Sequence, residues 1–204
     1  MRFIELFPVD DWDEDSAPEE KTISPPWWGP PEDELGVAVP QSVVIGRSDH
    51  GVIALSHVLV YSVGVAFEFI AVARELKRAD TQRLFHEQHA FSLDELPDGF
   101  IRLGLELSDG KRVSNIAARA GRHRMMRGDG EPEAPVFMPH GGGGGSGHEN
   151  AVTMKPGYWL WPLPPAGPLN ISCEWPAVGI GLSTVKIDGE KLVTAGGQAR
   201  KLWE

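Results

Sequence analysis

The sequence predicts a mainly β protein: an antiparallel β-sandwich, immunoglobulin-like or jelly-roll-like, with a proline- and acid-rich N-terminal arm and a short C-terminal helix. Apolar and polar residues alternate over several segments, which is typical of strands that bury one face. The chain holds 24 glycines and 17 prolines, so turns are expected to be frequent. No segment shows the strand–helix–strand rhythm of a parallel sheet.

Charge divides the chain into two parts. The net charge is −10, and residues 1–36 alone hold eleven acidic and two basic residues among clustered prolines. We therefore predict an acidic, Pro/Trp-rich arm over 1–36 and a single, nearly neutral β-sandwich domain over 37–204. Glycine-rich or poorly patterned stretches in that domain predict flexible segments near 119–133 and 140–156.

Composition argues against secreted and membrane-bound classes of protein. The N-terminus has no cationic start followed by an apolar run, which is the pattern of a secretory signal. No apolar stretch is long enough to span a bilayer as a helix. Cys173 is the only cysteine, which excludes an intrachain disulfide. We expect a cytoplasmic protein with no membrane association.

Two long strands are expected to form a hairpin over residues 52–74. In "VIALSHVLVYS" the predicted buried face carries Ile53, Leu55, Leu59 and Tyr61. In "VAFEFIAVARE" it carries Val65, Phe67, Phe69, Ala71 and Ala73. His57 lies within the first strand, where we expect a hydrogen-bonded core or edge histidine rather than a metal ligand.

Two helices and further strands follow from local signals. "ADTQRLFHEQHAF" predicts a short helix capped by Asp80, and Asp188 predicts the cap of a C-terminal helix. The dipeptide Asp109-Gly110 predicts the turn of a second hairpin. Alternation in "PLNISCEW" places Cys173 on a buried face, as a small apolar side chain rather than a reactive thiol. The expected core comprises Leu55, Leu59, Phe67, Phe69, Leu103, Leu105, Ile171 and Cys173.

The segment "PHGGGGGSGHEN", residues 139–150, matches several motifs only in part. A dinucleotide fingerprint needs a following helix and a phosphate loop needs Gly-Lys-Ser/Thr, and neither is present. An esterase oxyanion motif needs a downstream nucleophile elbow, which is also missing. Two alternatives stay open: a slack connection, or a backbone that an aromatic group or a neighbouring chain approaches closely.

Three residues of this segment are candidate metal ligands: His140, His148 and Glu149. Imidazole and carboxylate groups suit zinc or iron, and His123 is a further possible ligand. Five glycines between the two histidines oppose the preorganisation that a metal site needs. We therefore rank a metal- or small-ligand-binding enzyme as an alternative rather than as the main hypothesis.

Four tryptophans are candidate partner contacts. Trp27 and Trp28 lie in "SPPWWGPPEDE", where prolines favour a polyproline II backbone. They either fold back onto their own domain or anchor a partner or second copy. Trp159 and Trp161 share one strand face, which is either outward or buried under the arm or a helix.

A run of basic residues is a further candidate for contact with a partner. Residues 111–127 hold six basic residues and no acidic residue, including Arg119, Arg122 and Arg124. Such a run can follow phosphates, but it lacks interleaved aromatic residues and belongs to a nearly neutral domain, so nucleic-acid binding is the minor alternative. We expect this run to contact the acidic arm instead.

Two stretches together resemble a known family. Residues 135–180, with "WLWPLPPAGPL" and "CEWP", and the earlier "PPWWGPPEDE" are similar to segments of uncharacterised actinobacterial proteins of about this size. The resemblance covers most of the chain and implies that the arm, the glycine run and the Trp-Pro strand pair belong together. It implies no catalytic residues.

The sequence thus favours a non-enzymatic interaction or structural module that binds a protein partner or forms a homo-oligomer through the Trp/Pro-rich arm. We expect no catalytic residues and no cofactor. The metal- or small-ligand-binding enzyme and the nucleic-acid-binding protein remain the alternatives.

Overall fold

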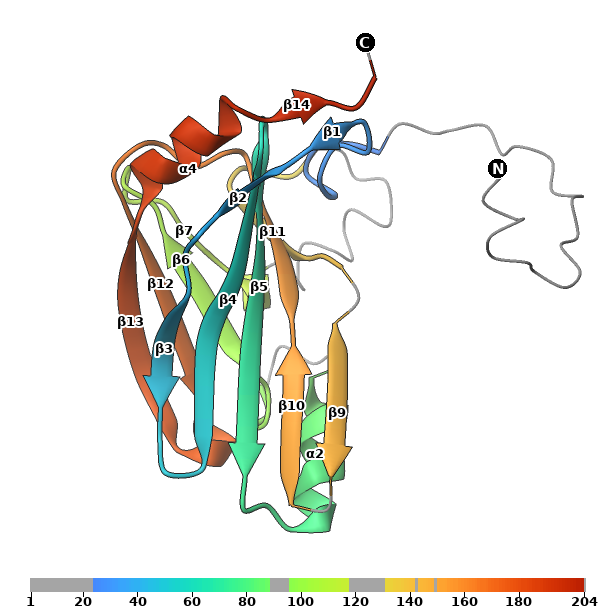
Figure 1. Ribbon diagram of the computed structural model, residues 1–204. Helices are drawn as coiled ribbons and strands as arrows, with labels where there is room; N and C mark the ends of the chain where they lie inside the picture. The colour runs from blue at the N-terminus through green and yellow to red at the C-terminus, as the bar shows by residue number, and fades with distance from the viewer. Residues whose placement is uncertain (1–23, 89–95, 118–130, 142, 149, 204) are drawn as a thin grey trace, which may run out of the picture.

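The computed structural model describes residues 24–88, 96–117, 131–141, 143–148 and 150–203. Over these residues the chain is mainly β, and all of their strand pairs are antiparallel, as predicted. Two larger sheets and one two-stranded ribbon hold the strands. Figure 1 shows β4 and β5 as the long central strands of the larger sheet.

The larger sheet is built around the predicted hairpin. Strands β2 and β3 pair with successive parts of β4, and β11 and β10 pair with successive parts of β5. Strands β8 and β9 pair with β11 and β10. The bounds are β2 (Val37–Val39), β3 (Val43–Arg47), β4 (Gly51–Tyr61), β5 (Gly64–Arg74), β8 (Val136–Pro139), β9 (Gly144–His148), β10 (Ala151–Lys155) and β11 (Gly157–Trp161).

Strands β8–β9 and β10–β11 form one long hairpin with an interruption. Pro139 lies opposite Tyr158 and Gly144 lies opposite Lys155, so the chain has four residues between the two pairs on one side and two on the other. Gly141 has a φ of +75°, a conformation that glycine adopts without strain. The start of the glycine run therefore absorbs the extra length, as the bulged side of a strand pair does.

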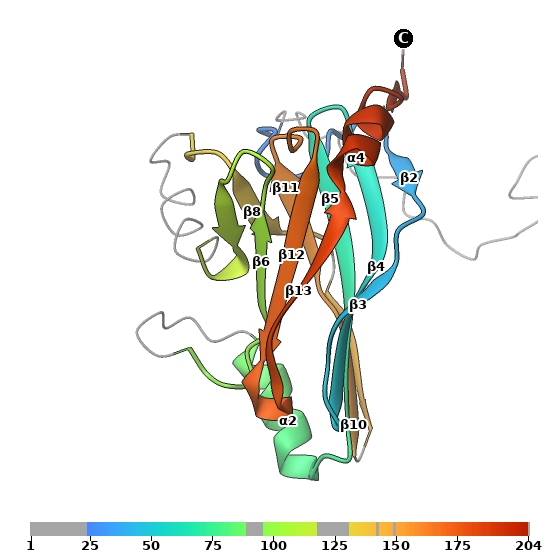
Figure 2. The same ribbon diagram turned by 90° about the vertical axis from the view of Figure 1, so that its left-hand side faces the viewer.

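The second sheet has the order β13-β12-β6-β7. Its strands are β6 (Arg102–Glu106), β7 (Arg112–Ser114), β12 (Pro168–Trp175) and β13 (Ile180–Asp188). The predicted Asp109-Gly110 turn lies between β6 and β7, with a φ of +83° at Gly110. Figure 2 shows the two sheets as separate layers, and buried residues from both belong to one apolar core.

A β-bulge changes which residues of β4 reach the core. The pairing of β4 with β5 shifts between Leu55 and His57. Beyond the shift, Val58 and Val60 are buried and Leu59 is only half buried. The prediction that Leu59 belongs to the core is therefore wrong, because one extra residue reverses the alternation. The other seven predicted core residues are buried.

Two α-helices and a short 3-10 helix (η1, Pro176–Val178) are described. Helix α4 (Gly189–Gly196) begins as predicted, because the Asp188 carboxylate accepts a hydrogen bond from the N–H of Glu190. Helix α2 (Arg78–Glu87) is not capped by Asp80: Lys77 is its N-cap, and Asp80 lies in the first turn, 3.5 Å from Arg83. None of the helices in the described residues is long and apolar enough to cross a membrane.

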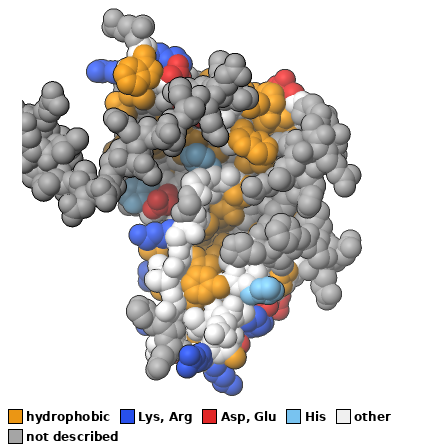
Figure 3. Space-filling view, turned by 90° about the vertical axis from the view of Figure 1, so that its right-hand side faces the viewer, with side chains coloured by type: hydrophobic (Ala, Val, Ile, Leu, Met, Phe, Trp, Pro, Cys, Tyr) orange, Lys and Arg blue, Asp and Glu red, His pale blue; other side chains and the backbone are white. Residues whose placement is uncertain are grey.

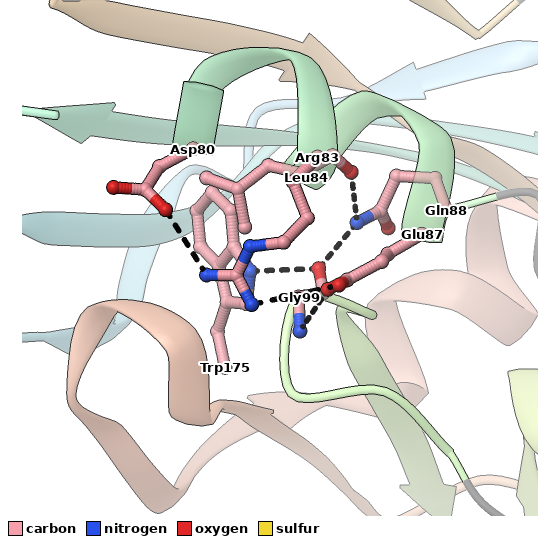
Figure 4. Close-up of polar contacts among 7 residues, drawn as sticks. All are labelled: Asp80, Arg83, Leu84, Glu87, Gln88, Gly99 and Trp175. Atoms are coloured by element: carbon pink, nitrogen blue, oxygen red, sulfur yellow. Dashed lines mark hydrogen bonds and ion pairs between the residues drawn. The ribbon is translucent and has the colours of Figure 1, made fainter. Parts of the chain in front are cut away.

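Helix α2 is anchored to the second sheet at Gly99 (Figure 4). The Gln88 amide donates to the Gly99 carbonyl, and its oxygen accepts from the N–H of Ile101 at 3.2 Å. The Glu87 carboxylate accepts from the N–H of Gly99 at 2.7 Å, and the Trp175 indole donates to the Gly99 carbonyl at 2.9 Å. The side chains of Glu87 and Gln88 thus form the hydrogen bonds with the backbone of residues 99 and 101 that a neighbouring strand would otherwise form.

A short ribbon pairs β1 (Glu34–Leu35) with β14 (Arg200–Lys201). Glu34 is buried, and its carboxylate accepts hydrogen bonds from the N–H and the hydroxyl of Ser62, at the tip of the β4–β5 hairpin. Lys201 forms an ion pair with Asp33 at 3.0 Å. These contacts hold residues 33–35 in place, and residues 24–31, which precede them in the chain, lie over the larger sheet.

Candidate functional site: a tryptophan platform covered by a proline-rich strap

Four apolar side chains of β8 and β11 form a surface that we call the platform: Val136, Met138, Trp159 and Trp161. Trp159 lies opposite Met138 and Trp161 lies opposite Val136 in the strand pairing, so all four share one face. The alternate residues Tyr158, Leu160 and Phe137 belong to the main core. Both faces of this strand pair therefore carry large apolar side chains.

Residues 24–31, which we call the strap, cover the platform. The rings of Trp27 and Trp161 meet edge to face, with their centroids 5.7 Å apart. Trp27 and Trp161 pack with Val136 and Met138 in a small apolar cluster that is separate from the main core. The strap and the platform thus share a small apolar cluster of their own.

One hydrogen bond fixes the strap on the platform. The Trp159 indole N–H donates to the carbonyl of Pro26 at 2.9 Å. The N–H of Trp28 donates to the carbonyl of Pro25 at 2.9 Å, which closes a turn. The expected polyproline II conformation is therefore wrong at residues 25–28, because this turn directs the Trp27 ring onto Trp161.

An imidazole lies beside this contact. His140 is half buried, and its ring centroid lies 6.4 Å from that of Trp159. A Cβ added at Gly29 of the strap would stand 3.4 Å from Nδ1 of His140, which is an ordinary contact distance. Burial lowers the pKa of His140, because a charged imidazole loses solvation there.

The four predicted tryptophans therefore have different positions. Trp159 is fully buried, so a partner could reach its ring only after the strap leaves. Trp27 and Trp161 are half buried against each other, and Trp28 is 39% exposed. Of the alternatives left open, the structure has the strap, which is the described part of the arm before β1, folded back onto its own domain, and large side chains on both faces of β11 are buried. Figure 3 shows hydrophobic side chains in the upper half of the face on the β9 side.

The sequence did not identify Val136 and Met138 as site residues. The signal was the run "PVFMP", in which three consecutive apolar residues predict burial on both faces of a strand. The carbonyl of Pro26 has no sequence signal, because any residue carries one.

His140 and His148, two of the candidate metal ligands, lie at different places in the strand pairing. His140 lies beside Trp159, whereas His148 ends β9 and is opposite Ala151. Extended strand separates Gly144 from His148 by about 13 Å at roughly 3.3 Å per residue, and His140 lies beyond the interruption. The strand pairing thus separates the backbone of these two histidines, and the metal site stays a prediction. Glu149 and His123 lie outside the described residues, among which no group of three metal-ligating side chains occurs.

Residues 144–148 of the glycine-rich segment form a strand and not a slack connection. Strand β9 pairs with β10 along its length, and a Cβ at Gly145 would stand 2.6 Å from Cε1 of Phe85 in α2. A Cβ at Gly147 would stand 2.9 Å from Cε2 of the same ring. Of the two alternatives, close approach by an aromatic group is therefore confirmed. Within the segment over 140–156 that was predicted to be flexible, β9 and β10 form paired strands.

One serine–histidine–glutamate cluster lies at the β4 bulge. Nδ1 of His57 is 3.0 Å from the Glu68 carboxylate and 3.3 Å from the Ser56 hydroxyl. A catalytic triad needs the serine and the acid on different imidazole nitrogens, and here the same nitrogen faces both. The cluster fits the hydrogen-bonded edge histidine that the sequence predicts.

The cysteine and the basic run give no further site. Cys173 is buried as predicted, and burial raises the pKa of its thiol to about 11. Lys111 and Arg112 form exposed ion pairs with Asp109 and Glu106. The candidates Arg119, Arg122 and Arg124 lie outside the described residues. The predicted contact between the arm, 1–36, and the basic run, 111–127, stays a prediction, because residues 1–23 and 118–130 lie outside them as well.

A scan of protein-family models and searches of curated proteins and solved structures find no match to this chain. The functional argument therefore rests on the platform and the strap.

Proposed function

We propose that this chain is a non-enzymatic β-sandwich interaction module that self-associates by exchanging the strap between copies. The sandwich class is supported by two antiparallel sheets that share one core. An immunoglobulin-like or jelly-roll-like topology is part of the same proposal. The observation that carries the function is the Trp159–Pro26 hydrogen bond, because it joins a surface to a segment 133 residues away in the chain.

The separate apolar cluster supports exchange. Because Trp27, Trp161, Val136 and Met138 are not part of the main core, the strap can leave the platform while both sheets stay packed. A strap from a second copy offers the same contacts, so the exchanged pair loses no interaction that the closed chain has.

Light scattering of the eluting full chain, from low micromolar to near-millimolar concentration, tests this function. We expect a dimer that grows with concentration, is lost in Trp27→Ala and is kept in Trp28→Ala. The second variant is the matched control, since Trp28 is the exposed neighbour. A parent chain that is monomeric at every concentration contradicts self-association.

Strap exchange also predicts where the dimer contact lies. We expect cross-links between strap residues and β11 to join chains of different isotopic mass when two labelled batches are mixed. Cross-links found only within one chain contradict the exchanged arrangement.

A further inference from the structure

We propose that the platform is a receptor for Pro-Pro-aromatic turns of other proteins, and that the strap is its built-in competitor. This inference rests on the interaction function proposed above and names the chemistry of the partner. The strap shows that chemistry directly, because it is a proline-rich segment already bound to the platform.

The platform is complete without the strap. Its four side chains come from β8 and β11, whose pairing with each other and with β5 involves no strap residue. Tyr61 of β4 supports Trp159, with ring centroids 5.7 Å apart in an edge arrangement. The indole N–H of Trp159 is therefore held in place as a donor by the sheet itself.

Each recognised group of the ligand can be read from the strap. The second proline supplies the carbonyl that accepts from Trp159, and the next residue supplies the ring that meets Trp161. The two prolines favour the turn, since proline fixes φ at the second turn position. Aromatic side chains are a general means of binding proline-rich segments, which usually bind in the polyproline II conformation. Here the segment binds as a turn, and the indole donor selects its proline carbonyl.

The next two positions of the ligand are tolerant. The side chain of Trp28 is 39% exposed, so the residue after the aromatic ring contributes little to binding. A Cβ at Gly29 would stand 3.4 Å from His140, which is ordinary contact and not a clash. The structure thus assigns the motif Pro-Pro-aromatic, followed by two positions with weak requirements.

The strap lowers the apparent affinity of the platform for a partner segment, because both bind the same residues. A tethered ligand competes at an effective concentration in the millimolar range, so a free segment binds weakly until the strap is displaced. Removing the Trp27 ring from the strap lowers that competition and leaves every platform residue in place.

The test is a fluorescence anisotropy titration with a labelled synthetic peptide of residues 24–34, added to full-length chains. We expect the Trp27→Ala chain to bind the peptide roughly tenfold more tightly than the parent chain does, because its own strap no longer competes. A peptide with Trp28→Ala is expected to bind like the parent peptide, and a peptide with Trp27→Ala is expected not to bind. Adding Trp161→Ala to the Trp27→Ala chain is expected to abolish binding.

Absence of saturable binding to a folded Trp27→Ala chain overturns the proposal, and so does equal binding of the Trp27→Ala peptide. If circular dichroism shows that Trp27→Ala is unfolded, the Trp27→Leu chain takes its place, since leucine keeps apolar contact and lacks the ring. A monomeric chain that binds the peptide removes self-association and keeps the receptor. A dimeric chain that binds no peptide removes the receptor and keeps self-association.

Discussion

The ring of Phe85 occupies the place of a side chain at Gly145, because a Cβ there would stand 2.6 Å from its Cε1 atom. The contact joins helix α2 to the outermost strand of the larger sheet. A strand with any larger residue at position 145 would push the helix away. The glycine run is therefore a docking surface for α2.

Replacing Gly145 by alanine is expected to destabilise the fold by about 1 to 3 kcal/mol, as overpacking does. Gly144→Ala is the matched control, since no atom lies within 4 Å of its Cβ position, and it is expected to change stability by less than about 0.5 kcal/mol. Urea unfolding measures both. In a Phe85→Ala background the cost of Gly145→Ala should largely vanish. Equal effects of the two glycine variants contradict the contact.

The bulge in β4 predicts unequal costs for two large apolar residues. Phe69→Ala is expected to cost about 3 to 5 kcal/mol, because the ring is fully buried. Leu59→Ala should cost clearly less, because the bulge directs Leu59 out of the core. Chemical denaturation compares the two variants. If Leu59→Ala destabilised the fold more than Phe69→Ala, β4 would have to pair with β5 without the bulge, with Leu59 in the core.

The anchor of helix α2 predicts a specific role for Gln88. Gln88→Ala leaves the N–H of Ile101 without its partner, which is expected to cost about 1 to 3 kcal/mol. Gln88→Glu keeps the acceptor but cannot donate to the Gly99 carbonyl. Gln82→Ala, at an exposed position of the same helix, is the control. Equal melting temperatures for Gln88→Ala and Gln82→Ala would contradict the stabilising role of the Gln88 hydrogen bonds.

Protonation of His140 predicts a loss of stability at acidic pH. Burial lowers its pKa below the ordinary value of 6.5, so the unfolded chain binds this proton at a higher pH than the folded chain. The neutral His140 contributes its full stabilisation of the fold above pH 6.5. That stabilisation declines as the pH falls from 6.5 toward the lowered pKa. Melting temperatures at about pH 7.5 and about pH 5.5 measure this decline. The His140→Gln variant should show a smaller decline, and an unchanged one contradicts the assignment to His140.

Cys173 is expected to resist thiol reagents in the folded chain. Its pKa of about 11 leaves little thiolate at about pH 8, and the side chain is buried between the sheets. Mass spectrometry after exposure to iodoacetamide is expected to show no modification until denaturant unfolds the chain. Rapid modification under native conditions would mean that the second sheet opens at Cys173.

The sequence by itself determined features whose cause is local. Alternation of apolar residues predicted the β4–β5 hairpin and the burial of Cys173, because side chains in a strand alternate between its two faces. The turn at Asp109-Gly110 and the Asp188 cap were predictable because each depends on a few neighbouring residues.

Only the tertiary structure decided the features that depend on distant partners. The bulge after Leu55 is one extra residue set by pairing with β5, so the alternation within β4 does not reveal it. The glycine run has almost no side chains and therefore no pattern, and its strand β9 is defined by pairing with β10 and by the ring of Phe85 packed on it. Trp27 and Trp161 are both apolar in sequence, but only packing brings the strap onto the platform, where the two rings meet edge to face and half bury each other.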